Sequence, residues 1–322
     1  MDNLESKGNK LHIDNIIDKL YQIEDFDKLS KEESDYVNCI MINNEGYKLF
    51  FDGLKLYFTE EFDKAISLYI KSIELYNAHA MNNLAYCYEK GEGVEKDIDY
   101  AICLYKKAVE FGNSDAMNNL AICYENGKYM KRNINKAISL YNQAIKLDNP
   151  DAMNNLALCY YDEVGVKKDV NKSVLLFTKA VEFGNSDAMN NLAYCYINGE
   201  GIEKDIKRAI SLYEKAIALD NSSAMCNLAH CYNKGINVKK DINRAILLYI
   251  KAVKLDNSTA MNNLALCYEK DGYGYKKDIN KAIELYEKAI KLDNNNNNIH
   301  ENFKSLIKKY PSEYIIYLQS KY

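Results

Sequence analysis

The hexapeptide AMNNLA recurs along this chain at a fixed spacing, and that spacing limits what the chain can fold into. A variant, AMCNLA, begins at Ala224, and every copy lies a multiple of 36 residues from the first. The identical copies begin at Ala80, Ala116, Ala152, Ala188 and Ala260. The length of 322 residues would suggest two globular domains, but a short period overrides that expectation, because each unit then packs only on its neighbours. We therefore expect a repeat protein.

Aligning the chain with itself defines the units. A decayed copy over residues 45–80 precedes the well-matched ones, and the last unit carries one extra residue in its loop around DGYGY. The fifteen residues KAVEFGNSDAMNNLA are identical at 107–121 and 179–193, which indicates duplication of units. The six well-matched units begin at Met81, Met117, Met153, Met189, Met225 and Met261.

Each unit predicts two helices, which we name helix A and helix B. Helix A runs from about Ser114 to Glu125 in the second copy, with Asn113 as its N-cap and a glycine at its C-terminal end. Helix B opens near an aspartate such as Asp97 and carries apolar residues at helical spacing. With no strand signal, the sequence predicts an all-α fold, an alpha solenoid of helix-turn-helix repeats. Such helix pairs bury their apolar faces only by stacking, so both ends need caps.

The expected organisation has three parts. Residues 1–44 form an N-terminal helical cap, whose second helix opens with the capping-box pattern from Ser30 to Glu33. Residues 45–293 form seven repeats, and residues 294–322 contain an Asn-rich break, Asn294 to Asn298, followed by C-terminal capping helices. The residues expected to close the stack there are Phe303, Leu306, Ile307, Ile315, Ile316 and Leu318.

The spacing of the repeated residues resembles the Sel1-like repeat, a relative of the tetratricopeptide repeat, over about residues 45–293. The family often has glycine where Ala85 stands and tryptophan where Leu104 stands, so details of packing differ. The resemblance implies a right-handed superhelix whose A helices line the concave side. It also implies an adaptor, because such proteins serve in complex assembly, protein quality control and host–pathogen interaction. The matching residues are Ala80, Leu84, Ala85, Tyr88, Gly91, Gly93, Val94, Asp97, Ala101, Tyr105, Ala108, Gly112 and Ala116.

One position on helix A varies from unit to unit while its neighbours hardly change. Turning the helix by about 100° per residue places Leu84 on the buried arc and position 86 on the opposite arc, with Asn82, His79 and Glu89. A variable, mostly apolar residue facing away from the core has no packing reason to be there. We therefore predict that these ladder residues line a groove and contact a partner: Tyr86, Ile122, Leu158, Tyr194, His230 and Leu266.

Beside the ladder residues runs a column of asparagines. An Asn side chain offers two donors and an acceptor, which match the backbone of an extended peptide whatever its sequence. We expect this column to bind the partner's backbone; the alternative, hydrogen bonds to neighbouring helices or water, remains open. For Asn83 and its counterparts, nearer the buried arc, a structural role is favoured. The column consists of Asn82, Asn118, Asn154, Asn190 and Asn262, and Cys226 interrupts it.

Six cysteines also recur at the period, as Cys87, Cys123, Cys159, Cys195, Cys231 and Cys267. A disulfide needs Cα atoms within roughly 7 Å, whereas stacked helices lie roughly 8–10 Å apart, and a zinc site needs four ligands around one ion. We expect these cysteines to pack as small apolar residues. The tyrosine columns on both helices, exemplified by Tyr88 and Tyr105, are expected in the core.

Motifs of catalysis do not occur in the sequence. The four histidines are far apart and fit no HExxH pattern, and there is no GxxxxGK[ST] loop, GxSxG elbow or CxxC pair. We expect no catalytic residues, no cofactor and no metal, and hence no enzyme. The N-terminus lacks the apolar segment of a signal peptide and no run of about 18 apolar residues occurs, so we expect a cytoplasmic protein.

The predicted function is a non-enzymatic scaffold or adaptor that binds a peptide or protein partner in the groove. The net charge of −4, from 46 acidic and 42 basic residues, gives no reason to expect nucleic acid. Two alternatives are a regulatory subunit of an enzyme complex and a binder of an anionic partner through a basic loop edge; interleaved acidic residues also allow a merely solvated edge. The basic pairs are Lys131 with Arg132, Lys167 with Lys168, Lys239 with Lys240, and Lys276 with Lys277.

Overall fold

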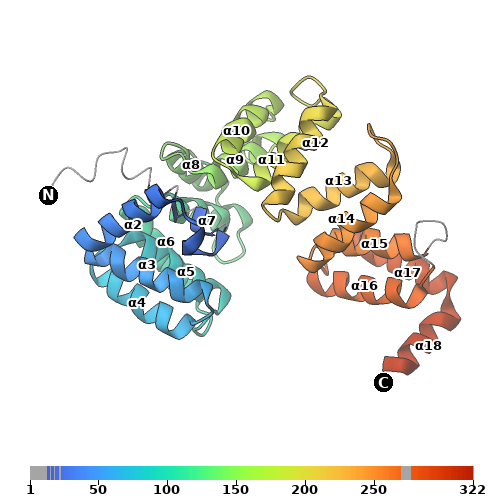
Figure 1. Ribbon diagram of the computed structural model, residues 1–322, viewed down its shortest axis with the longest axis horizontal. Helices are drawn as coiled ribbons and strands as arrows, with labels where there is room; N and C mark the ends of the chain where they lie inside the picture. The colour runs from blue at the N-terminus through green and yellow to red at the C-terminus, as the bar shows by residue number, and fades with distance from the viewer. Residues whose placement is uncertain (1–12, 15, 18, 22, 270–276, 322) are drawn as a thin grey trace. The chain divides into compact units, whose positions relative to one another are not determined.

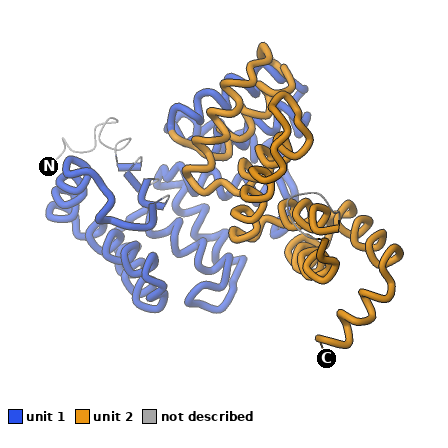
Figure 2. Tube along the Cα trace, turned by 45° about the vertical axis from the view of Figure 1, so that its right-hand side comes forward, with its two compact units in different colours: residues 1–183 blue, residues 184–322 orange. Residues whose placement is uncertain are grey.

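The computed structural model describes residues 13–14, 16–17, 19–21, 23–269 and 277–321. Within these residues the chain contains helices and no strand, which confirms the expected all-α fold of paired helices (Figure 1). The chain divides into two compact units, residues 1–183 and 184–322 (Figure 2). We describe each unit by itself.

The first unit contains four successive helix pairs. The described residues between 13 and 23 are helical, and the short 3-10 helix η1 (Phe26–Lys28) follows. Helices α3 with α4, α5 with α6, α7 with α8 and α9 with α10 form the pairs, and the second helix of each pair packs on the first helix of the next. The bounds are α2 (Lys31–Asn43), α3 (Glu45–Phe58), α4 (Phe62–Glu74), α5 (Ala78–Lys90), α6 (Ile98–Glu110), α7 (Ser114–Asn126), α8 (Ile134–Ile145), α9 (Pro150–Asp162) and α10 (Val170–Glu182).

The second unit repeats this arrangement with three pairs and a terminal pair. Helices α11 with α12, α13 with α14 and α15 with α16 form the repeats, and α17 packs on both α15 and α16. The bounds are α11 (Ser186–Asn198), α12 (Ile206–Ala218), α13 (Ser222–Lys234), α14 (Ile242–Lys254), α15 (Ser258–Glu269), α16 (Ile279–Leu292), α17 (Asn297–Lys309) and α18 (Pro311–Lys321).

The ends of the helices lie where the repeated polar residues and glycines predict them. Asn113 caps α7, because its side chain accepts a hydrogen bond from the backbone N–H of Ala116 at 2.7 Å. Asp97 caps the following B-type helix by accepting from the backbone of Tyr100. Gly127 ends α7 in the left-handed conformation, at a φ of 63°. The capping box from Ser30 to Glu33 is also confirmed.

The core is built from small residues on the A helices and tyrosines on the B helices. The B-helix tyrosines are 0–1% exposed, which confirms their expected place in the core: Tyr69, Tyr105, Tyr141, Tyr213, Tyr249 and Tyr286. The alanines of the hexapeptide, such as Ala116 and Ala121, are fully buried. Small side chains there allow the helices to approach closely, and the tyrosines fill the space between them.

The decayed first copy departs from the 36-residue register in a way that its sequence did not reveal. The loop between α3 and α4, residues 59–61, is four residues shorter than residues 91–97 between α5 and α6. Helix α3 therefore corresponds to α5 with an offset of 32 residues. With that offset, Phe50, Phe51 and Leu54 stand where α5 has Asn82, Asn83 and Tyr86, and all three are fully buried.

The C-terminal cap differs in part from the expectation. Leu306 is 1% exposed and closes the core as predicted, and Asn297 and Asn298 lie inside α17. Ile315 and Ile316, expected to close the stack, are 55% and 59% exposed, because α18 instead turns Tyr317 inward, where its hydroxyl donates to Glu287 at 3.0 Å. The loop around DGYGY lies outside the described residues.

Candidate functional site

The ladder residues lie on the surface of the A helices, as their variability suggested. Tyr86 and Tyr194 are 39% and 45% exposed, and His230 is exposed too. Ile122, Leu158 and Leu266 are half-buried. Each unit therefore carries three ladder residues on three successive A helices: α5, α7 and α9 in the first, and α11, α13 and α15 in the second. Because side chains of core type stand partly in solvent there, this A-helix face is the candidate site.

Two ladder residues carry a polar or charged feature. The Lys90 ammonium lies 5.3 Å from the centre of the Tyr86 ring, a cation–π distance. Burial, with a smaller effect of Lys234, lowers the pKa of His230, so its imidazole is uncharged at pH 7. The ladder residues are therefore aliphatic or aromatic, and Tyr86 and His230 add polar groups to the column.

The asparagine column does not lie on the exposed arc, and the expected orientation of these side chains is wrong. Its members are only 5–9% exposed: Asn82, Asn118, Asn154, Asn190 and Asn262. His79, which was placed on the same arc, is 5% exposed. An ideal helical wheel assigns one core-facing arc, but within each unit A helices also pack on one another, as α7 does on α9 and α11 on α13, and this covers a second arc.

The two asparagines of the hexapeptide connect successive repeats. The second Asn of one repeat donates its Nδ2 to the Oδ1 of the first Asn of the preceding repeat. The distances are 3.0 Å from Asn119 to Asn82, 2.9 Å from Asn155 to Asn118 and 2.9 Å from Asn227 to Asn190. Asn302 of α17, which belongs to no copy of the hexapeptide, makes the same bond to Asn262 at 2.9 Å. Where Cys226 interrupts the column, Asn263 meets only its sulfur, at 3.6 Å. Repetition of AMNNLA thus supplies an amide–amide bond between A helices at three interfaces, those of α5 with α7, α7 with α9 and α11 with α13.

The N-cap asparagines make a second set of contacts between repeats. The Nδ2 of Asn149 lies 2.8 Å from Asp115 Oδ1, and that of Asn221 lies 2.7 Å from Asp187 Oδ1. In the first interface the equivalent contact joins Asn113 Nδ2 to His79 Nδ1 at 3.0 Å. Each cap therefore orders its own helix with one amide atom and fixes the neighbouring helix with the other.

The N-terminal segment contacts the A-helix face of the first unit, which the sequence did not predict. The Tyr21 hydroxyl donates to Asn83 Oδ1 at 2.6 Å, and an oxygen of Asp14 lies 3.3 Å from His79 Nε2. Burial and the charges of Asp14 and Asp151 raise the pKa of Asp115 to about 7. The spacing of the apolar residues between 13 and 20 could have predicted an amphipathic helix, but the sequence does not indicate which surface this helix covers.

A cationic residue in the first turn of helix B lies over the A-helix tyrosine of the same repeat. The distances to the ring centres range from 4.2 Å for Lys172 over Tyr160 to 5.9 Å for Arg208 over Tyr196. In the repeat of Tyr88 the position is Tyr100, and the two rings meet edge to face at 4.8 Å. These tyrosines are buried or half-buried, so their column joins helix A to helix B.

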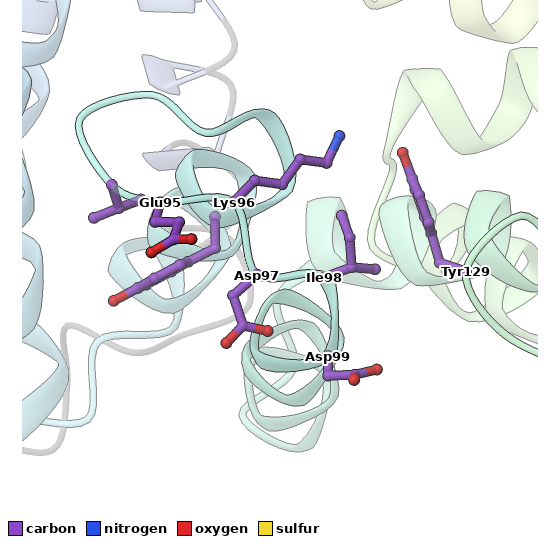
Figure 3. A pocket seen from close by; sticks show the side chains of 8 residues that line it. Glu95, Lys96, Asp97, Ile98, Asp99 and Tyr129 are labelled. Carbon is purple, nitrogen blue, oxygen red and sulfur yellow. The ribbon is translucent and has the colours of Figure 1, made fainter.

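The basic loop edge carries charges of both signs. Arg132 donates its Nε to the Glu125 carbonyl at 2.8 Å, and Lys277 lies 4.3 Å from the Tyr310 ring centre; Lys276 lies outside the described residues. A shallow pocket of about 790 Å³ opens on this edge. Figure 3 shows Glu95, Asp97 and Asp99 among the lining residues together with Lys96 and Tyr129. Three carboxylates and one ammonium make this lining acidic, so the pocket does not favour an anion.

The cysteine column is buried and reduced. None of the nine cysteines forms a disulfide, and Cys103 is exposed and unpaired. Burial raises the pKa of Cys87 and of Cys159 to about 12, so both thiols are protonated and unreactive at neutral pH. Across the described part of the chain, no group of three or more His, Cys, Asp or Glu side chains is placed to hold a metal ion. No helix there is long and apolar enough to cross a membrane.

Stacked helix pairs, bound through buried amides and presenting one variable face, define the class of tandem-repeat binding scaffolds. The Sel1 repeat family matches residues 78–113, 114–149, 150–185, 186–221, 222–257 and 258–294. The chain belongs to this family, whose members are typically non-catalytic scaffolds for protein–protein interaction. No curated protein sequence matches the chain.

Solved structures give the same fold. A Sel1 repeat protein from Oxalobacter formigenes is 29% identical, with a TM-score of 0.64, covering 76% of this chain and 100% of that one. The protective antigen c5321 of uropathogenic Escherichia coli, which has an SLR fold, is 21% identical, with a TM-score of 0.53 and coverage of 94% and 65%. The APC/C hetero-tetramer Cut9–Hcn1 gives 16% identity, a TM-score of 0.60 and coverage of 95% and 57%.

Proposed function

We propose that this protein is a non-enzymatic adaptor that binds a peptide or protein partner on its A-helix face, with the ladder residues as contacts. The observation that carries the proposal is the ladder itself. At this position the A helices change between Tyr, Ile, Leu and His while keeping the side chain partly in solvent, whereas the residues on either side, 83–85 and 87–88 in the first well-matched unit, are the same in all six. A structural role would favour one residue type, whereas recognition of successive partner side chains favours variation.

The buried asparagines supply the rigidity that such a surface needs. Each Asn–Asn bond fixes one A helix against the next, so the ladder residues are held at set spacings before a partner arrives. Binding then loses little conformational entropy on the scaffold side. The first Asn column therefore takes part in recognition indirectly, by positioning Tyr86, Ile122 and their counterparts, and not by contacting a peptide backbone over its whole length.

A similar fold occurs within a protein assembly, the APC/C hetero-tetramer Cut9–Hcn1. At 16% identity this likeness concerns the fold alone. The partner of the present chain is therefore defined by chemistry only: a segment with apolar or aromatic side chains that contact the ladder.

The test is capture of partners from a lysate by three forms of the chain, identified by mass spectrometry. The ladder variant carries Ile122→Asp, Leu158→Asp and Tyr194→Asp, which place charges on the A-helix face. The matched control carries Leu175→Asp and Leu247→Asp, since these B-helix leucines are 56% and 61% exposed elsewhere on the repeats. Circular dichroism first establishes that all three forms are folded.

Partners captured by the native chain and the control, but lost with the ladder variant, are the expected result. Partners retained by the ladder variant would contradict the proposal. If the ladder variant retained its partners and their binding weakened steeply as the salt concentration rose from about 50 to about 200 mM, the contact would be electrostatic, and the basic loop edge would become the binding surface.

A further inference from the structure

The N-terminal segment is an amphipathic helix seated on the A-helix face. Its apolar side chains follow the spacing i, i+3, i+4 and i+7 and are 0–4% exposed: Ile13, Ile16, Ile17 and Leu20. This is the pattern with which a separate helix binds a surface. On the adjacent side of the segment, Asp14 and Tyr21 supply polar contacts.

The contacts of this segment reach two successive A helices. Tyr21 lies edge to face with Phe58 of α3, at 5.9 Å between ring centres, and donates its hydroxyl to Asn83 of α5. Asp14 pairs with His79 of α5. A capping helix that merely extended the stack would contact the terminal repeat, whereas this segment contacts the first two repeats.

The A-helix face of α3, which the segment contacts through Phe58, is apolar. In α3 the face carries Phe50, Phe51 and Leu54, all fully buried, where α5 has two asparagines and a half-exposed tyrosine. Phe26, just beyond the segment, lies edge to face with Phe51 at 6.1 Å. The first A helix thus offers an apolar floor, and the second offers His79 and Asn83 as polar partners.

The chain joins this helix to the repeats through a short connection. Residues 24–30, which contain η1, separate the segment from α2. A helix held by so short a tether is present at an effective concentration of about the millimolar range. It would therefore outcompete any ligand of weak affinity for the same surface.

We propose that the A-helix face of α3 and α5 is a binding site for an amphipathic helix, and that the described residues between 13 and 23 occupy it as a displaceable internal ligand. The external ligand is a partner helix with the same spacing of Ile or Leu, an acidic residue facing His79 and a hydroxyl or amide facing Asn83. This inference rests on the proposed function for the existence of a partner, but its own site is separate from the ladder residues Ile122 and Leu158.

The first experiment uses the chain's own segment as the probe. A fluorescent peptide of residues 11–26 is titrated by anisotropy against the full native chain and against a full-length released variant, Ile16→Asp with Leu20→Asp. The peptide carrying Leu20→Asp is the matched control. We expect the released variant to bind the native peptide on the order of 100-fold more tightly than the native chain does, because the tethered competitor is gone.

Equal affinity for both chains, or no binding to a folded released variant, would overturn the proposal. The second measurement needs no substitution. Hydrogen exchange of the native chain should show residues 13–23 exchanging at least 10-fold faster than α5 without global unfolding, as a displaceable segment requires. If residues 13–23 and α5 exchanged at the same rate, the segment would be a permanent part of the core and the proposal would be wrong. Both measurements use only this chain's own sequence. They therefore test the internal ligand even if the capture experiment finds no partner for the ladder residues.

Discussion

Asn118 shows how a side chain that is suited to bind a ligand serves instead to hold the protein together. Its carboxamide oxygen accepts from Asn155 at 2.9 Å, and the residue is 5% exposed. The same bond joins Asn119 to Asn82 and Asn227 to Asn190. A buried amide bond is worth little by itself, but leaving one partner unpaired costs more.

Asn118→Ala should therefore destabilise the protein measurably. We expect a loss of about 1–3 kcal/mol in the free energy of unfolding, because the Asn155 amide keeps its desolvation cost and loses its acceptor. Urea denaturation would measure the loss, with Leu156→Ala, expected to cost about 2–5 kcal/mol, as a reference for a core cavity. If the double variant with Asn155→Ala showed strict additivity, the two side chains would not be coupled.

Cys226 offers the reverse experiment. Its sulfur is a weak acceptor that lies 3.6 Å from Asn263 Nδ2, whereas the other described interfaces have an amide oxygen in that place. We expect Cys226→Asn to restore the regular bond and to raise the stability by about 0.5–1.5 kcal/mol. Cys226→Ser, whose hydroxyl is too short to take over the geometry of an amide, should bring no such gain in thermal unfolding. A loss of stability with Asn would show that this interface has adapted to cysteine.

Asp115 should make stability depend on pH. Burial, Asp14 and Asp151 raise its pKa to about 7, so the folded state holds a proton that the unfolded state releases near pH 4. Stability should consequently fall as the pH rises from about 4 to about 7, and then level off. Asp115→Asn keeps an oxygen for Asn149 and should be more stable than the native chain by at least about 1 kcal/mol at pH 8, but not at pH 4. If the free energy of unfolding depended on pH in the same way in the native chain and in Asp115→Asn, Asp115 would not be the cause of the pH dependence.

At the scale of helices, local signals decide where each element begins and ends. Asn113 and Asp97 open their helices and Gly127 closes one, because these interactions involve residues only three or four positions apart. The offset of α3 arises at the same scale, from a shorter loop. The sequence did not reveal this offset, because α4 aligns with α6 at the regular spacing of 36 residues. The four residues that are missing from the loop before α4 therefore went unnoticed.

Gly165 allows the loop after α9 to lie close against α8, the B helix of the preceding repeat. Gly165 has a φ of 70°, and a Cβ there would overlap with Ile134 of α8; Gly184 has a φ of 84° but open space around it. We expect Gly165→Ala to cost about 2–5 kcal/mol, combining backbone strain with the clash, and Gly184→Ala only about 1–2 kcal/mol. Thermal unfolding of both variants would separate the cost of backbone strain, present in each, from the cost of the clash, present only in Gly165→Ala. Equal losses would mean that the loop moves away from α8 without cost.

At the scale of the whole molecule, the repeats should be removable in units of 36 residues. Deleting residues 114–185 joins Asn113 to Ser186 and recreates the sequence KAVEFGNSDAMNNLA at the junction. Because each repeat packs only on its neighbours, we expect unchanged helicity per residue and cooperative unfolding, at a lower melting temperature. Deletion of residues 114–131, half a repeat, should abolish cooperative unfolding by circular dichroism. Tolerance of both deletions would mean that the A–B alternation does not build the core.

The sequence by itself determined the period, the pairing of helices, their caps, the tyrosine core and the position of the ladder residues. All of these follow from local chemistry repeated at fixed spacing, so Asn113 or Tyr105 can be understood from a few neighbouring residues. The tertiary structure alone decided that Asn82 is buried, that Ile315 and Ile316 are not, and that Tyr21 reaches Asn83. These outcomes depend on contacts between segments tens of residues apart, and a helical wheel contains no information about what packs against each of its arcs.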